Sequence, residues 1–262
     1  MPSRVRQPYR CEATSLQGFI KQLAVTYVGR SRCFFYVTGS VSPRLSPAEH
    51  DRRLIDKYSV DISRFTRSRR KRAGIAPVHY LRYGSFWVLL CGKGKHRFFD
   101  SHRHFDAGAG DRVPMYRDLR KEPLKVWFDC HGERLAYAIS YSNDKARVQI
   151  ERRSYLVLKS YFVDIATKRS TDELIDAFWR IPFEPYGRVI YQLFCIKRAV
   201  DRARKVAGLP GPLPNDAIPT RRRPVTVFEQ PATLSPSNMI SKQAHTHVSE
   251  LLTPRSEPTE FR

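Results

Sequence analysis

Residues 33–41 read CFFYVTGSV, a short run of aromatic and β-branched residues. This composition favours a central strand rather than a helix. The preceding residues predict a helix over 16–28, which Gly29 is expected to end. The apolar residues at helical spacing in it are Leu16, Phe19, Ile20, Leu23 and Tyr27. The chain is therefore expected to begin with a helix that leads into a buried strand.

A second helix is predicted from Pro47 to about Tyr58. Ser46 is suited to the N-cap, proline is favoured at the first helical position, and Glu49 completes a capping box. These are the clearest local signals in the sequence.

A third helix is expected from about Asp61, with Ile62 and Phe65 facing inward, and it should stop near Gly74 and Pro77. Its second half is strongly basic. The cations are Arg64, Arg67, Arg69, Arg70, Lys71 and Arg72. The helix pair thus ends in a basic cluster.

Strands are predicted next, separated by glycine turns. From Val78 to Asp100 the turns at Gly84 and at 92–95 predict a three-stranded meander. A second antiparallel meander is predicted from the segments 124–130, 134–141 and 146–151.

Three helices should follow, at 152–168, from Thr171, and at 185–207. Ser170 and Glu173 form a capping box for the second, and Gly208 ends the third. The expected fold class is α+β. An antiparallel sheet of two meanders plus a leading strand is flanked by an N-terminal helix group and a C-terminal three-helix segment.

One basic domain is expected over residues 15–207, after a flexible N-terminus, 1–14. Residues 208–262 are rich in Pro, Ser and Thr with few large apolar residues, which predicts a mostly disordered tail.

Net charge points to a polyanionic partner. The chain has 47 Lys and Arg against 25 Asp and Glu, a formal charge of +22. Residues 208–262 contribute only +1 of it, from six basic and five acidic residues, so +21 belongs to residues 1–207. Such a surplus repels itself unless counterions or a polyanion neutralise it, and nucleic acid is the commonest such partner.

Two segments are candidates for phosphate contact. The arginines of the run 64–72 have planar groups that suit phosphate oxygens, although cations at a helix end also stabilise the helix dipole without any ligand. The turn after Gly92 carries Lys93, Lys95 and Arg97, and its glycines would let main-chain amides approach a phosphate. A plain exposed hairpin turn is the alternative.

A metal site and a base-stacking surface are further candidates. Asp100, His102, His104 and Asp106 would share one face of an extended segment, where imidazole and carboxylate suit a divalent cation. A polar surface loop is the alternative. Aromatic residues on the predicted strands lie beside basic ones and would stack on bases if they were exposed. They are Tyr80, Tyr83, Trp87, Phe98 and Phe99. Most strand aromatics belong to a core, so at most one or two of them are expected to face a ligand.

The cysteines and the lack of an apolar segment suggest a cytoplasmic protein. Five scattered cysteines form no Cys-x-x-Cys pair, which indicates reduced thiols. No stretch of about 18 apolar residues and no hydrophobic export segment occurs, so no membrane partner is expected.

The order of strand, helix pair with a basic stretch, and strand hairpin resembles the N-terminal half of HUH endonucleases, the rolling-circle replication initiators and single-strand transposases. The resemblance covers about residues 33–100 and includes the strand FFYVT at 34–38. Where that family has two histidines around a hydrophobic residue, this chain reads FWVLL at 86–90, and the nearest His-x-His is His102 and His104.

The HUH resemblance implies a strand-nicking activity dependent on Mg or Mn. It places the nucleophilic tyrosine on a later helix, where Tyr155 or Tyr161 matches by position.

The chain also looks like a group of basic bacterial open reading frames of unknown activity. The shared patterns are FYVTG at 35–39, RRKRAG at 69–74 and PFEPY at 182–186. This resemblance implies a single evolutionary unit and no mechanism.

The function expected from the sequence is nucleic-acid binding, with DNA favoured over RNA, by a protein associated with a mobile element or plasmid. Binding itself should require no cofactor. A metal-dependent nicking enzyme is the alternative, and an RNA-associated structural component is the second alternative.

Overall fold

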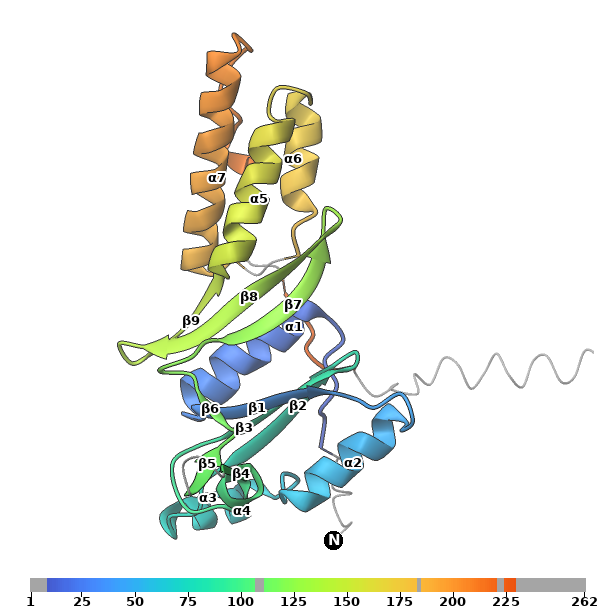
Figure 1. The fold of residues 1–262 in the computed structure, drawn as a ribbon, viewed down its shortest axis with the longest axis vertical. Helices are drawn as coiled ribbons and strands as arrows, with labels where there is room; N and C mark the ends of the chain where they lie inside the picture. Colours follow the sequence, from blue (N-terminus) through green and yellow to red (C-terminus); the bar gives the residue numbers. More distant parts are fainter. Residues whose placement is uncertain (1–8, 107–110, 183–184, 221–223, 230–262) are drawn as a thin grey trace, which may run out of the picture. The chain divides into compact units, whose positions relative to one another are not determined.

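The strand expected at the centre of the fold is β1 (Phe35–Ser40), which lies inside a four-stranded antiparallel sheet with the order β2-β3-β1-β6 (Figure 1). Its companions in this first sheet are β2 (Val78–Tyr83), β3 (Phe86–Cys91) and β6 (Arg117–Asp118). A second antiparallel sheet consists of β7 (Leu124–Cys130), β8 (Glu133–Ser142) and β9 (Lys145–Ile150). A separate hairpin consists of β4 (Arg103–Asp106) and β5 (Asp111–Pro114).

The helices fall into three groups along the chain. The first is α1 (Leu16–Lys21), which continues as a π-helical stretch, η1 (Gln22–Arg30). The second is α2 (Pro47–Lys57), α3 (Arg64–Arg72) and α4 (Arg97–Ser101). The third is α5 (Arg152–Ile165), α6 (Thr171–Trp179), α7 (Gly187–Val206) and a 3-10 turn, η2 (Asn215–Ala217). The α+β class is confirmed.

This computed structural model describes residues 9–106, 111–182, 185–220 and 224–229, with only the backbone of 104–106 and 111–113. The chain divides into a unit that ends at Phe228 and a second unit, Glu229–Arg262. All helices and strands named above belong to the first unit. None of these helices is long and apolar enough to cross a bilayer.

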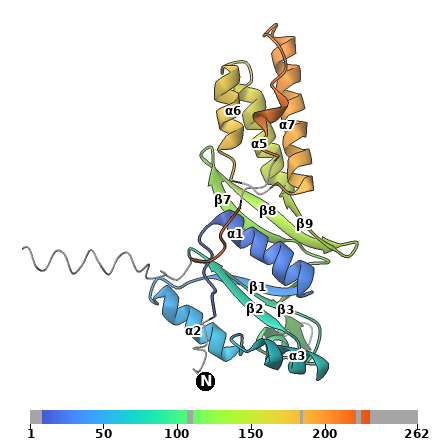
Figure 2. The same cartoon turned by 180° about the vertical axis from the view of Figure 1, so that it is seen from behind.

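Helices and sheets alternate within the first unit. The continuous helix α1–η1 lies between the two sheets, in contact with β2 on one side and β9 on the other (Figures 1 and 2). The opposite face of the first sheet is covered by α2 and α4, and α5 and α7 contact β8 and β9 of the second sheet.

Two apolar cores result, because successive residues of a strand face opposite sides of a sheet. Val88 and Leu90 of β3 belong to a large first core, shared with α1–η1, the second sheet and α5–α7. Leu89 and Cys91 face a second core under α2 and α4. The buried members of the second core are Tyr58, Val60, Ala76, Val78, Tyr80, Leu89, Cys91 and Phe98.

Local signals set several helix boundaries as predicted. Ser46 caps α2, and its hydroxyl accepts from the amide of Glu49 at 3.2 Å, although the Glu49 carboxylate accepts from Arg53 instead of closing the box. Ser170 and Glu173 make both hydrogen bonds of a capping box at α6. The second meander and the three C-terminal helices also lie where the sequence predicts them.

Two expectations for the middle of the chain are wrong. The third strand of the first meander, up to Asp100, is the helix α4, whose N-cap His96 accepts from the amide of Phe98. Phe98 is fully buried in the second core, so tertiary packing overrides its β preference. Phe65, expected to face inward, is 86% exposed, because α3 buries no residue at all.

The ordered unit extends beyond both expected ends of the domain. Before residue 15, the Tyr9 hydroxyl donates to the Tyr80 carbonyl at 2.8 Å. After residue 207, Leu213 and Ile218 are buried, and η2 contacts α6. The hydroxyl of Thr14 donates to the carbonyl of residue 226, which anchors the returning chain near α1. Residues 221–223 and 230–262 of the expected tail lie outside the described residues.

A buried ion pair joins α2 to the edge of the first sheet. Arg82 on β2 is only 4% exposed, and its Nε donates to both carboxylate oxygens of Asp51 at 2.9 and 3.0 Å. Its terminal nitrogens donate to Glu12 at 3.0 and 2.7 Å, and the Tyr80 hydroxyl donates to Asp51 at 2.6 Å. Burial alone would lower the pKa of Arg82, but the hydrogen bonds and charges of these carboxylates raise it.

Replacement of Asp51 by Ala should destabilise the fold by about 3 to 5 kcal/mol, because it leaves the buried guanidinium without its main partner. Glu12→Ala is the matched control, since the Glu12 side chain is 60% exposed and its loss should cost only about 0 to 1 kcal/mol. Urea unfolding of both variants measures the difference. Equal stability of the two variants would contradict this role for Asp51.

His79 is a neutral imidazole within the first sheet. It is 5% exposed and stacks on Tyr27 of η1, with ring centroids 4.3 Å apart. Its Nε2 has no hydrogen-bond partner among the described residues. Burial, and secondarily the charge of Arg67, lowers its pKa to about 3.

Acid should therefore destabilise the protein through His79. The unfolded chain takes up a proton near the ordinary pKa of about 6.5 whereas the folded chain resists it, so stability is lost as pH falls from about 6.5 towards about 3. Between about pH 7 and pH 5 this residue should account for about 2 kcal/mol. His79→Phe keeps the stack and should reduce the loss by that amount in urea unfolding at both pH values. An unchanged pH dependence would disprove the assignment.

Candidate functional site

The helix α3 presents the predicted basic run to solvent. Ser63 caps it, with its hydroxyl accepting from the amide of Thr66, and arginine and lysine are good helix formers. Arg64, Arg69, Lys71 and Arg72 are exposed, whereas Arg67 and Arg70 are half-buried. Arg67 donates to the Val60 carbonyl at 3.3 Å. The helix contains no carboxylate, so its other cations are not neutralised from within.

The second predicted segment, the turn after Gly92, docks on the end of this helix. The amide of Lys95 donates to the Gly74 carbonyl at 2.9 Å, and the amide of Ala76 donates to the Lys95 carbonyl at 3.1 Å. Gly94 has φ +131°, and a Cβ there would lie 2.5 Å from the Gly74 oxygen, so only glycine fits. The structure thus joins two separately predicted basic segments into one surface.

A cavity of about 650 Å³ opens on this surface. Lys71 from α3 and Lys93 from the turn line it, together with two cations that the sequence did not indicate, Arg32 and Arg120. Its other lining residues are Ser31, Phe34, Gly74, Ile75, Pro77, Gly94, Tyr141 and Asp144.

The register of the first sheet explains why these residues meet. Both β3 and β6 run antiparallel to β1, and Phe35 at the start of β1 pairs with Cys91 and Asp118 near their ends. The segment that leads into β1 therefore lies beside the segments that follow β3 and β6. Arg32 lies three residues before β1, and Lys93 and Arg120 lie two residues after β3 and β6.

Aromatic rings hold the two arginines in place. Arg32 lies over the Tyr141 ring at 5.5 Å, and Arg120 lies over the Phe34 ring at 5.1 Å. The two rings pack on each other with centroids 4.4 Å apart. The guanidinium groups are thus oriented before any ligand arrives, which lowers the entropic cost of binding.

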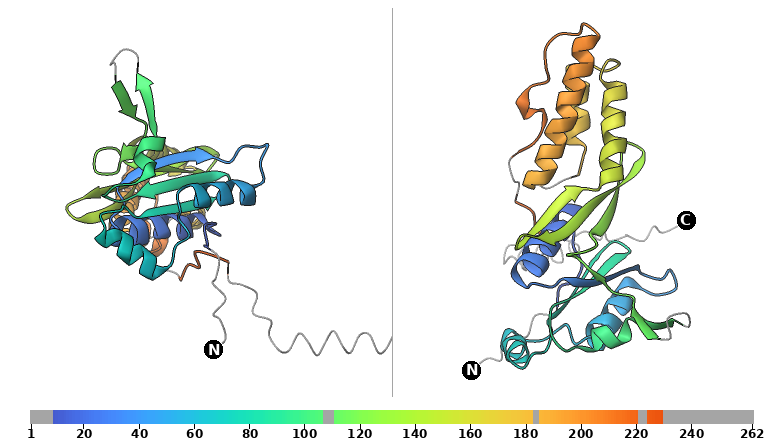
Figure 3. Two further views of the ribbon diagram at one scale, coloured as in Figure 1. Left: turned by 90° about the horizontal axis from the view of Figure 1, so that it is seen from below. Right: turned by 60° about the vertical axis from the view of Figure 1, so that its left-hand side comes forward.

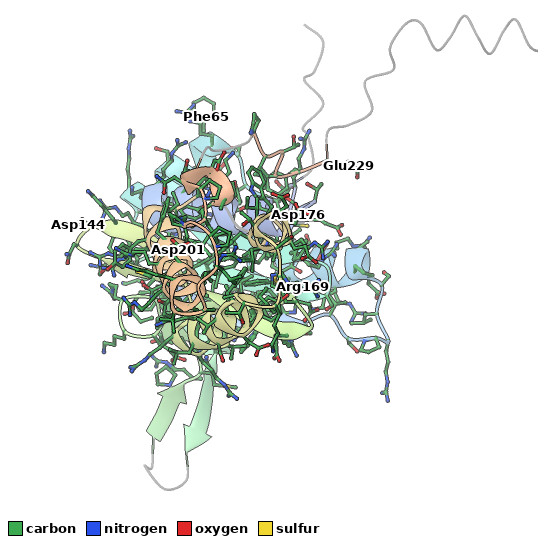
Figure 4. All side chains as sticks on the ribbon, turned by 90° about the horizontal axis from the view of Figure 1, so that it is seen from above. Phe65, Asp144, Arg169, Asp176, Asp201 and Glu229 are labelled. Carbon is green, nitrogen blue, oxygen red and sulfur yellow. The ribbon has the colours of Figure 1, made fainter. Side chains whose placement is uncertain are left out.

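Two carboxylates modulate this charge. Asp118 receives a bidentate contact from Arg120, whose hydrogen bonds and charge lower the pKa of Asp118 despite the opposing effect of burial. Asp144 is the one carboxylate among the lining residues, and its Oδ1 accepts from Arg32 and from the Tyr141 hydroxyl, each at 3.2 Å. Its side chain is 88% exposed at a turn (Figure 4). Four cations against these two carboxylates leave a net positive charge, which suits a phosphate group.

Arg97, the remaining predicted phosphate contact, has a structural role. Its Nη1 donates at 2.8 Å to the Lys57 carbonyl at the end of α2. Lys95 is exposed beside the cavity but does not line it.

The predicted metal ligands do not share one extended face. Asp100 is exposed on the helix α4, and His102 is the C-cap residue of that helix. His104 and Asp106 lie on β4, which with β5 extends away from both sheets (Figure 3), and their side chains lie outside the description. Alternation fails because the segment starts as a helix. Among the described side chains no group of three or more His, Cys, Asp or Glu is arranged to hold a metal.

His102 instead packs against the second core. Its Nε2 lies 3.0 Å from the Tyr58 hydroxyl, and its ring stacks on Tyr58 and contacts Phe98. Burial, followed by the charge of Lys57, lowers its pKa.

The two candidate nucleophiles lie elsewhere in the fold. Tyr155 and Tyr161 on α5 pack against the first core, so both sheets separate them from His102 (Figure 1). Tyr161 stacks on His131 at 4.5 Å, and burial raises the pKa of Tyr155, the opposite of activation. The structure does not bring these tyrosines together with the predicted metal ligands.

The aromatic residues considered for base stacking are packing residues, as expected for most of them. Tyr80 and Phe98 are fully buried, and Tyr83, Trp87 and Phe99 are partly buried against the cores.

No family model, no curated protein and no solved structure matches the chain.

Asp144→Asn should increase the affinity of the cavity for inorganic pyrophosphate by about 2- to 5-fold. It removes an exposed carboxylate that competes for Arg32, and an exposed ion pair of this kind contributes about 0.5 to 1 kcal/mol. Asparagine tolerates the positive φ of this position and keeps an acceptor for Tyr141. Asp176→Asn on α6 makes the same change of charge at another exposed site and should have no effect. Calorimetric titration compares them. Equal affinities of the two variants would exclude Asp144 as a competitor.

Proposed function

We propose that this protein binds nucleic acid, and that the phosphates of the nucleic acid contact α3 and the adjoining cavity. The observation that carries the proposal is the convergence of Arg32, Lys71, Lys93 and Arg120 on one cavity beside a helix without a carboxylate. The cations of the cavity would bind phosphate oxygens, and the exposed cations of α3 extend the positive surface to further phosphates of the same nucleic-acid strand.

A polyanion is favoured over an anionic membrane as the partner. A helix that binds a bilayer surface needs a continuous apolar face, and α3 has the sequence RFTRSRRKR with one large apolar residue. DNA remains favoured over RNA, and association with a mobile element or plasmid rests on the HUH resemblance. A cytoplasmic location is supported by the five free cysteines.

Replacement of Arg69, Arg70, Lys71 and Arg72 by Ala should weaken binding and reduce its salt dependence. Each lost phosphate contact should lower the slope of log affinity against log salt by about 0.7 to 0.9, so the change should reach about 3. Alanine preserves the helix. Fluorescence anisotropy with a labelled oligonucleotide over a salt series measures the slope.

The matched control removes four exposed cations from α5 and α7, Arg153, Arg188, Arg202 and Lys205. Net charge falls equally in both variants, so only a local contact distinguishes them. If both variants lose affinity and slope alike, binding is a property of overall charge and α3 is not the interface. If the wild-type protein binds without salt dependence, the proposal itself fails.

A further inference from the structure

The ring of Phe65 is the most exposed aromatic side chain among the described residues. It is 86% exposed on the first turn of α3 and points away from the fold (Figure 4). Single exposed apolar residues are common on protein surfaces, so exposure alone indicates nothing. The setting is what distinguishes Phe65, since its helix buries no residue and otherwise consists of six cations, two Ser or Thr and no carboxylate.

Helical spacing places the ring beside two arginines. Residues three, four and seven positions after Phe65 share its face, and they are Ser68, Arg69 and Arg72. Both arginines are exposed. One face of α3 thus presents an aromatic ring followed by guanidinium groups over a rise of about 10 Å.

This combination suits a strand with unpaired bases. An exposed ring offers a stacking surface to any base, and neighbouring arginines bind the phosphates on either side of it. In a duplex the bases are already stacked on one another, so the ring has no free base face to meet. The charge complementarity comes from α3 itself, and the lack of other apolar residues gives the ring no support for membrane insertion.

We infer that Phe65 is a stacking platform for an unpaired base, so that the partner is a single-stranded nucleic acid whose flanking phosphates contact Arg69 and Arg72. This inference rests on the proposed function and specifies its ligand.

The test compares wild-type protein with Phe65→Ala, Phe65→Trp and Val206→Ala. Val206 on α7 is also 86% exposed, so its variant removes an equally exposed apolar side chain away from α3. Each protein is titrated by anisotropy against single-stranded DNA, single-stranded RNA, the corresponding DNA duplex and anionic phosphatidylserine vesicles, over a salt series.

Phe65→Ala should weaken binding to a single strand by about 5- to 150-fold, the range expected for one stacked base. Its salt slope should stay unchanged, because no ionic contact is lost. Duplex affinity should stay within about 2-fold, and Val206→Ala should match the wild type. Phe65→Trp should retain affinity, and the fluorescence of the added tryptophan should be quenched by the oligonucleotide.

Three results would overturn the inference while leaving the proposed function intact. In the first, Phe65→Ala binds single strands as tightly as the wild-type protein does. In the second, it loses the same affinity for single strand and duplex, and in the third it loses affinity only for vesicles. Absence of salt-dependent binding by the wild-type protein to any nucleic acid would instead overturn both proposals. Because the ring contributes nothing to either core, loss of folding should not obscure the result.

Discussion

The buried guanidinium of Arg82 sets the arrangement of the N-terminal half. A cation with 4% exposure needs partners that replace its lost hydration, and here they are carboxylates from α2 and from the segment before α1. The backbone of Arg82 also bonds to this segment, through Cys11 and Ala13 at 2.7 and 2.8 Å. The side chain of Arg82 therefore fixes α2 on the sheet, and the backbone of the segment before α1 covers β2, which would otherwise be an open edge.

The placement of acidic residues has a consequence for the surface. Several carboxylates of this chain are engaged in structural contacts. Asp51 pairs with Arg82, Asp118 with Arg120, Glu151 caps α5, and Asp201 holds the amide of Leu213. Neither α3 nor the turn after Gly92 contains one. The positive surface therefore arises from the concentration of cations there together with the use of anions elsewhere.

Features fixed by short-range chemistry could be predicted from the sequence, and features fixed by packing could not. The capped helices α2 and α6 and the second meander follow from signals within about ten residues. The helix α4 does not, because its two phenylalanines favour a strand until Tyr58 and Tyr116 pack around them. Residues 209–220 carry too few apolar side chains to indicate order, yet Leu213, Ala217 and Ile218 are buried.

The candidate site divides in the same way. The basic run of α3 is contiguous, so composition alone locates it. Arg32 and Arg120 are 88 positions apart, and only the register of β3 and β6 against β1 brings them to one cavity. The prediction that Phe65 faces inward is wrong for a different reason. Helical periodicity predicts an inward residue only if a core exists on that side of the helix. Because α3 has no such core, the same ring at the same spacing faces solvent.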